Sequence, residues 1–195
     1  TKHLDDIAHY LPWMSARNLP RYEFTARDVR TGGLFVAYSW ALTLENAKRF
    51  ADELLKHLKS YAVDLSQVTI QTDHGSEFDM AATSRWACPE KSAFVQLVKS
   101  HGASYRAIPI KRPTFNSDVE RAHGLIEEEL YSLEDFRGLN EFLGKTLAYS
   151  LYFNYRRKNR YRDNRTPVDI LKEADPSLNG RIFASWMPIL LDTPQ

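Results

Sequence analysis

The sequence of 195 residues contains a single cysteine, Cys88, so no disulfide bond can form within it. No run approaches the roughly 18 consecutive apolar residues that a membrane-spanning helix needs. The first residues, from Thr1 to Asp6, lack the basic and apolar regions of a signal peptide. These absences predict a protein of the reducing cytoplasm that has no membrane partner.

An excess of charge of one sign is also lacking, because 26 Lys and Arg are matched by 25 Asp and Glu, for a net charge of +1. The distribution is uneven, since residues 155–165 contain six basic side chains and one acidic side chain. A hydrophobic share of 43% with 26% charged residues is typical of a folded globular domain. We expect one domain, with a core over residues 1–155 and a basic segment and C-terminal extension of the same domain over 156–195.

Hydrophobic periodicity predicts an α/β fold with five strands in one mixed sheet flanked by helices. Alternating side chains in Tyr22–Val29 indicate a half-buried strand that places Glu23 on the polar side, and Thr31-Gly32-Gly33 indicates a turn. The expected strands are residues 2–11, 22–29, 34–40, 67–73 and 104–110, and the expected helices are 44–60, 93–101, 117–133, 139–155 and 167–173.

Asp73 stands at the end of an apolar strand and is followed at once by the turn residue Gly75. A carboxylate in this position projects from the edge of a sheet into a crevice. Taken alone, an aspartate in this position is more often a residue that caps the strand or the turn.

The helix expected over 117–133 carries an apolar stripe, and Glu120 lies about 100° away from that stripe. Glu120 can therefore reach a cleft while the helix stays packed. The stripe comprises Val119, Ala122, Ile126, Leu130 and Leu133.

Four segments, in order along residues 3–172, resemble DDE-type transposases of bacterial insertion sequences and retroviral-type integrase cores. The segment around Asp73, Gln71-Thr-Asp-His-Gly-Ser-Glu-Phe78, is similar to that family's second-aspartate motif. The other three are Phe24-Thr-Ala-Arg-Asp-Val29, Pro113-Thr-Phe-Asn-Ser-Asp-Val-Glu-Arg-Ala-His123, and Asn154-Tyr-Arg-Arg157 with Arg165-Thr-Pro167. The resemblance implies a ribonuclease-H-like fold, which fits the predicted order of elements.

The resemblance further implies a bacterial enzyme that cleaves DNA and transfers its strands with a D,D,E triad of Asp6, Asp73 and Glu120. Asp6 is chosen over Asp5 because it keeps the family's three-residue spacing to a histidine, here His9, although Asp5 stays open. Only one of these two neighbours can face the site if both lie in a strand. The triad would hold two Mg²⁺ or Mn²⁺ ions, about 3.5–4 Å apart.

DNA, both transposon ends and target, is the implied partner, and the family's habit of assembling on DNA implies a homodimer or larger oligomer. The family also carries an N-terminal helix-turn-helix region, so we expect this chain to be the core of a longer protein that binds DNA weakly and in a salt-dependent way. The basic run could also be only a solvated helix end. Candidate contacts to the DNA backbone are Lys111, Arg112, Arg156, Arg157, Lys158 and Arg160, with His74 as a possible contact to substrate.

The sequence departs from the family at His74, which replaces an asparagine, and at Ser117, which replaces a glycine. Asp73 and Glu120 are also farther apart than the family usually places them, a difference that an insertion over 79–91 can absorb. We expect His9 and His123 to be hydrogen-bonded structural residues rather than metal ligands. Two other functions remain open: a catalytically silent domain that binds DNA or protein, and a plain ribonuclease-H-like nuclease.

Overall fold

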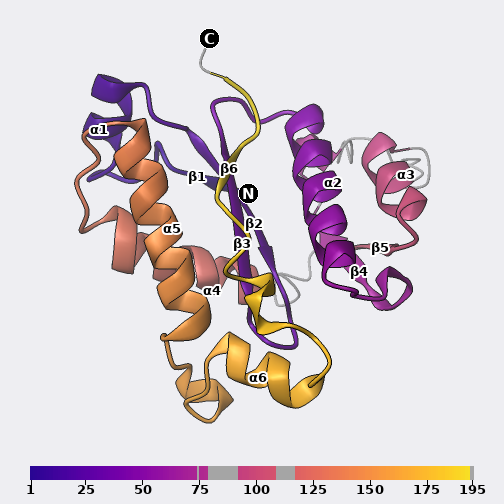
Figure 1. The fold of residues 1–195 in the computed structure, drawn as a ribbon. Helices are drawn as coiled ribbons and strands as arrows, with labels where there is room; N and C mark the ends of the chain where they lie inside the picture. Colours follow the sequence, from indigo (N-terminus) through magenta and orange to yellow (C-terminus); the bar gives the residue numbers. More distant parts are fainter. Residues whose placement is uncertain (74, 79–91, 109–116, 194–195) are drawn as a thin grey trace. The chain divides into compact units, whose positions relative to one another are not determined.

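The computed structural model describes residues 1–73, 75–78, 92–108 and 117–193, which form an α/β protein with six α-helices and two sheets (Figure 1). The chain divides into two compact units, which we describe separately. Unit one contains Thr1–Trp40 and Asp118–Gln195, and unit two contains Ala41–Ser117.

The sheet of unit one has four strands in the order β1-β2-β3-β6, namely β1 (Lys2–His3), β2 (Tyr22–Arg27), β3 (Leu34–Ser39) and β6 (Ile189–Leu190). Strands β1, β2 and β3 pair antiparallel, while β6 pairs parallel with β3. The predicted turn between β2 and β3 is confirmed. At Gly33 a Cβ atom would lie 2.3 Å from the Phe183 ring, so the chain needs a glycine there.

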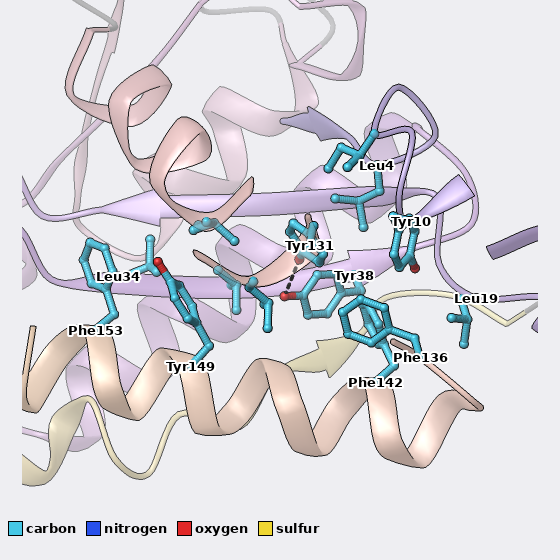
Figure 2. Packing of buried hydrophobic residues seen from close by; sticks show 14 of the residues in the cluster. Leu4, Tyr10, Leu19, Leu34, Tyr38, Tyr131, Phe136, Phe142, Tyr149 and Phe153 are labelled. Carbon is cyan, nitrogen blue, oxygen red and sulfur yellow. Dashed lines mark hydrogen bonds between the residues drawn. The ribbon is translucent and has the colours of Figure 1, made fainter. Parts of the chain in front are cut away.

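Strand β3 is covered on both faces, which accounts for its nearly continuous apolar sequence, and all six of its residues are buried. One face packs on helix α5 (Leu139–Tyr155), and Figure 2 shows Leu34 and Tyr38 beside Phe142, Tyr149 and Phe153. On the other face, the Phe35 ring lies 5.4 Å from Phe183 and 5.7 Å from Trp186.

The remaining helices of unit one are α1 (Leu11–Arg17), α4 (Ser117–Ile126) and α6 (Pro167–Ala174). Helix α4 continues into a π-helical turn over Glu127–Tyr131. The predicted stripe of this segment is confirmed at Ala122, Ile126 and Leu130, which are buried, but it is wrong at Leu133, which is 68% exposed. The stripe fails there because the helix ends at Tyr131, before it reaches Leu133.

The strand predicted over residues 2–11 is wrong beyond His3. Leu4, Ile7 and Tyr10 are all buried, a spacing of three that fits successive turns and not the alternation of a strand. The backbone follows this spacing, with Ile7 N–H donating to Leu4 C=O and Tyr10 N–H donating to Ile7 C=O. Asp6 therefore lies in a turn rather than mid-strand.

Two elements were missed by the sequence analysis. Helix α1 has Pro12 in its first turn, where proline is well accommodated although it usually signals a loop. Strand β6 has only two residues and pairs with β3 far along the chain, so it carries no local periodicity.

Unit two contains α2 (Leu44–Ser60), α3 (Ala93–Ser100) and a two-stranded sheet of β4 (Thr69–Thr72) and β5 (Ser104–Ala107). Helix α2 is capped by Thr43, whose side chain accepts from Asn46 N–H. Strands β4 and β5 are parallel, as expected for strands joined through a helix. A single five-stranded sheet is not confirmed, since the structure describes four strands in one unit and two in the other. The predicted insertion over 79–91 lies outside the described residues.

No helix in the described part of the chain combines the length and the apolar character needed to cross a membrane.

Candidate nucleic-acid interface and acidic residues

Glu120 is exposed in the first turn of α4 and makes no hydrogen bond or ion pair with another residue that the structure describes. The opposite side of the same helix is fixed, because Ala122 and Ile126 are 0% and 1% exposed in the core. The Glu120 carboxylate is therefore available to a ligand while its backbone is held in place.

Two polar contacts fix α4 to strand β2. Asp118 accepts from Arg27 Nε at 2.9 Å, and His123 Nε2 lies 3.0 Å from Thr25 Oγ1. The Arg27 side chain is only 6% exposed, and its burial lowers the pKa of the guanidinium although Asp118 opposes that shift. Arg27 also donates from Nη1 to Gly32 C=O. These contacts hold the helical turns on either side of Glu120.

Beneath α4 lies a buried polar network centred on Glu23, which is 0% exposed. Thr25 donates to Glu23 Oε1 at 2.7 Å, the Tyr131 hydroxyl lies 2.5 Å from Oε2, and Tyr131 also contacts the Tyr38 hydroxyl at 2.9 Å (Figure 2). The prediction that Glu23 lies on the polar side of a half-buried strand is wrong. Tyr131, 108 positions away, supplies the partner that allows the carboxyl group to be buried.

Burial shifts the pKa values of Glu23 and His123 in opposite directions. Burial raises the pKa of Glu23, while the hydrogen bonds from Tyr131 and Thr25 act against that rise. Burial lowers the pKa of His123 to about 3, with Lys2 contributing to the fall. Both shifts favour the uncharged form of the side chain.

In unit two, Asp73 follows directly after strand β4, as predicted, and is half-buried. Its Oδ1 accepts from Gly75 N–H at 3.2 Å, an arrangement that closes the turn. A Cβ atom at position 75 would lie 2.3 Å from Glu77 Oε2, so a larger residue there would displace the Glu77 carboxylate. His74, the possible substrate contact, lies outside the described residues.

The two candidates for the first carboxylate have different surroundings. Asp5 accepts from Arg21 Nε through Oδ2 at 2.5 Å, while its Oδ1 is buried with no hydrogen-bond partner in the described chain. That Oδ1 lies 3.8 Å from His3 Nδ1. Asp6 is exposed, and its charge adds a small contribution to the raised pKa of Arg21, which is due mainly to Asp5.

A cavity of about 560 Å³ in unit one is lined by seven cationic side chains and one carboxylate, that of Asp118. We call this cavity the basic pocket. Two of its lining residues, Asp118 and Arg121, lie within two positions of Glu120 in the sequence. Leu125 and Phe153 form an apolar part of the lining. The seven cationic side chains are Arg27, Arg121, Arg157, Lys158, Arg160, Arg162 and Arg165.

Four of these cations have structural partners. Arg27 binds Asp118, Arg157 binds Glu129 through both carboxylate oxygens, Arg165 binds Glu173 and Asp163, and Arg162 donates to the carbonyl groups of Val29 and Arg30. The other three, Arg121, Lys158 and Arg160, make no ion pair or hydrogen bond within the described ranges. They are the cations that remain available to an anionic ligand.

The predicted DNA contacts therefore fall into three groups. Lys158 and Arg160 line the basic pocket and are available, whereas Arg157 lines it but is engaged by Glu129. Arg156 is exposed and does not line the pocket. Lys111 and Arg112 lie outside the described residues.

The sequence analysis missed Arg27, Arg121, Tyr161, Arg162 and Arg165 as parts of this surface. Tyr161, Arg162 and Arg165 belong to the basic run that we had noted, so extending the candidate list to the end of the run would have found them. Arg27 and Arg121 come from a strand and a helix far from that run, and no local pattern connects them to it.

The carboxylate oxygens of Glu120 and Asp73 are of the hard type that Mg²⁺ and Mn²⁺ prefer, so their chemistry fits such an ion. Within the described part of the chain, neither oxygen of Glu120 has a partner, and the turn engages Asp73 through Oδ1. Among the described residues of either unit taken alone, no three His, Cys, Asp or Glu side chains form a group that could hold a metal ion.

Comparison with known proteins adds no family assignment, because no family model and no curated protein matches this chain.

Proposed function

We propose that this chain is the core of a metal-dependent DNA transposase or integrase that cuts DNA and transfers the cut strand. The observation that carries the proposal is that helix α4, held against β2 and the core, carries the exposed carboxylate of Glu120 and also contributes Asp118 and Arg121 to the lining of the basic pocket. A helix that carries an exposed carboxylate on one face and part of a basic pocket on another suits a phosphodiester substrate, which needs metal ligands and backbone contacts together. The four motif resemblances and the α/β elements support a ribonuclease-H-like fold.

The proposed carboxylate set is Asp6, Asp73 and Glu120. Two Mg²⁺ or Mn²⁺ ions held by it would offset the repulsion among the carboxylates and stabilise the charge that develops on the phosphate oxygens. The protein itself positions the Glu120 carboxylate, because Asp118 and His123 fix the helix that carries it.

Binding of DNA is assigned to the three available cations of the basic pocket, Arg121, Lys158 and Arg160. Such contacts orient the backbone without reading sequence, and their strength falls steeply as salt rises. We further propose that the protein acts in the bacterial cytoplasm and assembles on DNA as a homodimer or a larger oligomer.

The test is a nicking and strand-transfer assay on a labelled duplex with Mn²⁺ or Mg²⁺, comparing the chain with Asp73→Asn and Glu120→Gln. Glu128→Gln is the matched control, since Glu128 is an exposed carboxylate just beyond the same helix. We expect metal-dependent products that both site variants abolish and the control retains. Activity that survives in either site variant would contradict the triad.

The second candidate is a silent domain that binds DNA through the basic pocket without chemistry. It needs only the basic pocket and its three available cations, Arg121, Lys158 and Arg160. Titration with Mn²⁺ separates the two functions, because the silent domain would bind Mn²⁺ no better than Asp73→Asn does. A plain nuclease would cleave DNA but give no joined products.

A further inference from the structure

The basic pocket contains an aromatic ring that is open to a ligand. Tyr161, within the 3-10 turn Arg160–Arg162, lines the pocket and is 82% exposed. The Arg121 guanidinium lies over the ring, 4.8 Å from its centroid. Because a cation occupies one face of the ring and the ring is still largely exposed, the other face is available for stacking.

The pocket also has a rigid frame. The Arg157–Glu129 pair, with contacts of 2.6–2.9 Å, holds the end of α5, and the Arg27–Asp118 pair holds the start of α4. Both guanidinium groups lie over the Phe153 ring, 5.4 Å and 5.6 Å from its centroid. Arg121, Lys158 and Arg160 therefore line the pocket beside two cations, Arg27 and Arg157, whose charges are balanced by Asp118 and Glu129.

Size and composition restrict what this pocket accepts. Its volume of about 560 Å³ matches one small ligand, since such sites measure about 300–1,000 Å³, and it is too small to enclose a duplex. Three available cations require a ligand with negative charge, and an open aromatic ring favours one with a planar ring system. A nucleotide has both features, and bases of any sequence can stack on an aromatic side chain.

We propose that the basic pocket binds one unpaired nucleotide of a DNA strand, with its base stacked on Tyr161 and its phosphate held by Lys158 and Arg160. The inference rests on the proposed function, because it takes DNA as the substrate, and it adds that the preferred DNA has an unpaired nucleotide at or near the cut. Arg121, on the opposite face of the Tyr161 ring, would hold the ring in place for stacking.

The experiment measures binding in EDTA, so that it does not depend on the carboxylates or on catalysis. Two labelled duplexes of the same sequence are compared by fluorescence anisotropy, one blunt and one ending in a single unpaired 2-aminopurine nucleotide. We expect the unpaired end to bind at least about fivefold more tightly and the 2-aminopurine emission to be quenched on binding.

Variants then assign the effect to the ring. Tyr161→Ala should abolish both the preference and the quenching, while Tyr161→Phe should retain both because it keeps the aromatic face. Tyr152→Ala is the control, since Tyr152 is 47% exposed on α5 and does not line the pocket. The double variant Lys158→Gln, Arg160→Gln should weaken binding to the unpaired end. Its control is the double variant Arg17→Gln, Arg181→Gln, which removes the same number of positive charges and should weaken binding less.

Equal affinity for the two duplexes, or a preference that persists in Tyr161→Ala, would overturn the inference even if metal-dependent strand transfer were found. Displacement of the unpaired end by free dAMP at the same concentration would assign the pocket to free nucleotides and would overturn it as well. No binding to either duplex would also overturn it. Loss of activity in Asp73→Asn with binding intact would leave the pocket assignment standing, so the two proposals fail separately.

Discussion

His123 on α4 and Thr25 on β2 are joined by a hydrogen bond of 3.0 Å between the imidazole Nε2 and the hydroxyl oxygen. Thr25 uses its own proton to donate to Glu23, so the imidazole must be the donor in this pair. His123 is therefore the neutral tautomer with its proton on Nε2. Because His123 lies three residues after Glu120, the buried network is connected to the helical turn that carries the proposed metal ligand.

We predict that His123 does not titrate between pH 5 and pH 8, because burial lowers its pKa to about 3. Nitrogen-15 NMR of the imidazole should show the Nε2-protonated neutral form throughout this range. The same histidine in the urea-unfolded chain should titrate near its ordinary value of about 6.5. A midpoint above pH 6 in the folded protein would show that the imidazole is not buried as the structure has it.

The burial of Glu23 makes the folding stability of the protein depend on pH. Its pKa is raised in the folded state, so the unfolded chain loses the proton first as the pH rises above the ordinary carboxyl value. Folding stability should therefore fall as the pH rises toward the raised pKa of Glu23. Glu23→Gln removes this loss and should raise the free energy of unfolding at pH 8.

Glu129 is the matched comparison for Glu23, since Arg157 and Tyr149 hold the pKa of its carboxyl below the ordinary value despite some burial. Its contribution to stability is present above the ordinary carboxyl pKa and is lost as the pH falls. Glu129→Gln should therefore destabilise the protein most at neutral pH, where Glu23→Gln stabilises it. Urea titrations at pH 4 and pH 8 measure both variants, and a shift of the same sign for both would contradict the two assignments.

Elements with a strong local pattern were predictable from the sequence. The apolar stripe of α2 and the continuous apolar run of β3 each reflect burial that the local chain alone determines. Asp73 was placed correctly after its strand for the same reason. The turns after His3 were missed because the segment is short. Apolar residues three apart, separated by polar ones, can be mistaken there for the alternation of a strand.

The candidate site was less predictable because its contacts join distant parts of the chain. Glu23 is buried only because Tyr131 reaches it, and Arg27 contributes to the basic pocket only because Asp118 holds it there. Arg157 appeared to be one more cation of a basic run, yet it is bound to Glu129, 28 positions away. Sequence pattern identifies the charges, and tertiary pairing decides which of them remain available.

This division between paired and available cations predicts different effects for neighbouring residues. Arg157→Gln should lower the free energy of unfolding by about 1–3 kcal/mol, because it leaves Glu129 without its bidentate partner. Lys158→Gln should stay within about 0.5 kcal/mol of the wild type, and should reduce the salt dependence of DNA binding by roughly one phosphate contact.

Arg156→Gln is the control for both effects, since Arg156 neither lines the pocket nor pairs with Glu129. Denaturant unfolding and DNA binding at several salt concentrations measure the three variants side by side. If Arg156→Gln changed the salt dependence as much as Lys158→Gln, the contact would belong to the whole basic run and not to the pocket.

The last prediction separates Asp5 from Asp6. The Asp5 carboxylate is bound to Arg21 and is 16% exposed, so Asp5→Asn should act mainly on the fold and lower stability by roughly 1 kcal/mol. Asp6 is exposed in a turn, so Asp6→Asn should leave stability within about 0.5 kcal/mol of the wild type. If Asp6 is the first metal ligand, Asp6→Asn should nonetheless abolish metal-dependent strand transfer and weaken Mn²⁺ binding.

Arg21→Gln completes the comparison, because it removes the partner of Asp5 and leaves both carboxylates in place. If Asp5 acts only through its ion pair with Arg21, Asp5→Asn and Arg21→Gln should lower stability to a similar degree. Both variants should then retain Mn²⁺ binding. Full activity in Asp6→Asn would remove Asp6 from the triad. Loss of Mn²⁺ binding in Asp5→Asn but not in Arg21→Gln would instead identify Asp5 as the ligand, with its buried and unpartnered Oδ1 as the metal-binding atom.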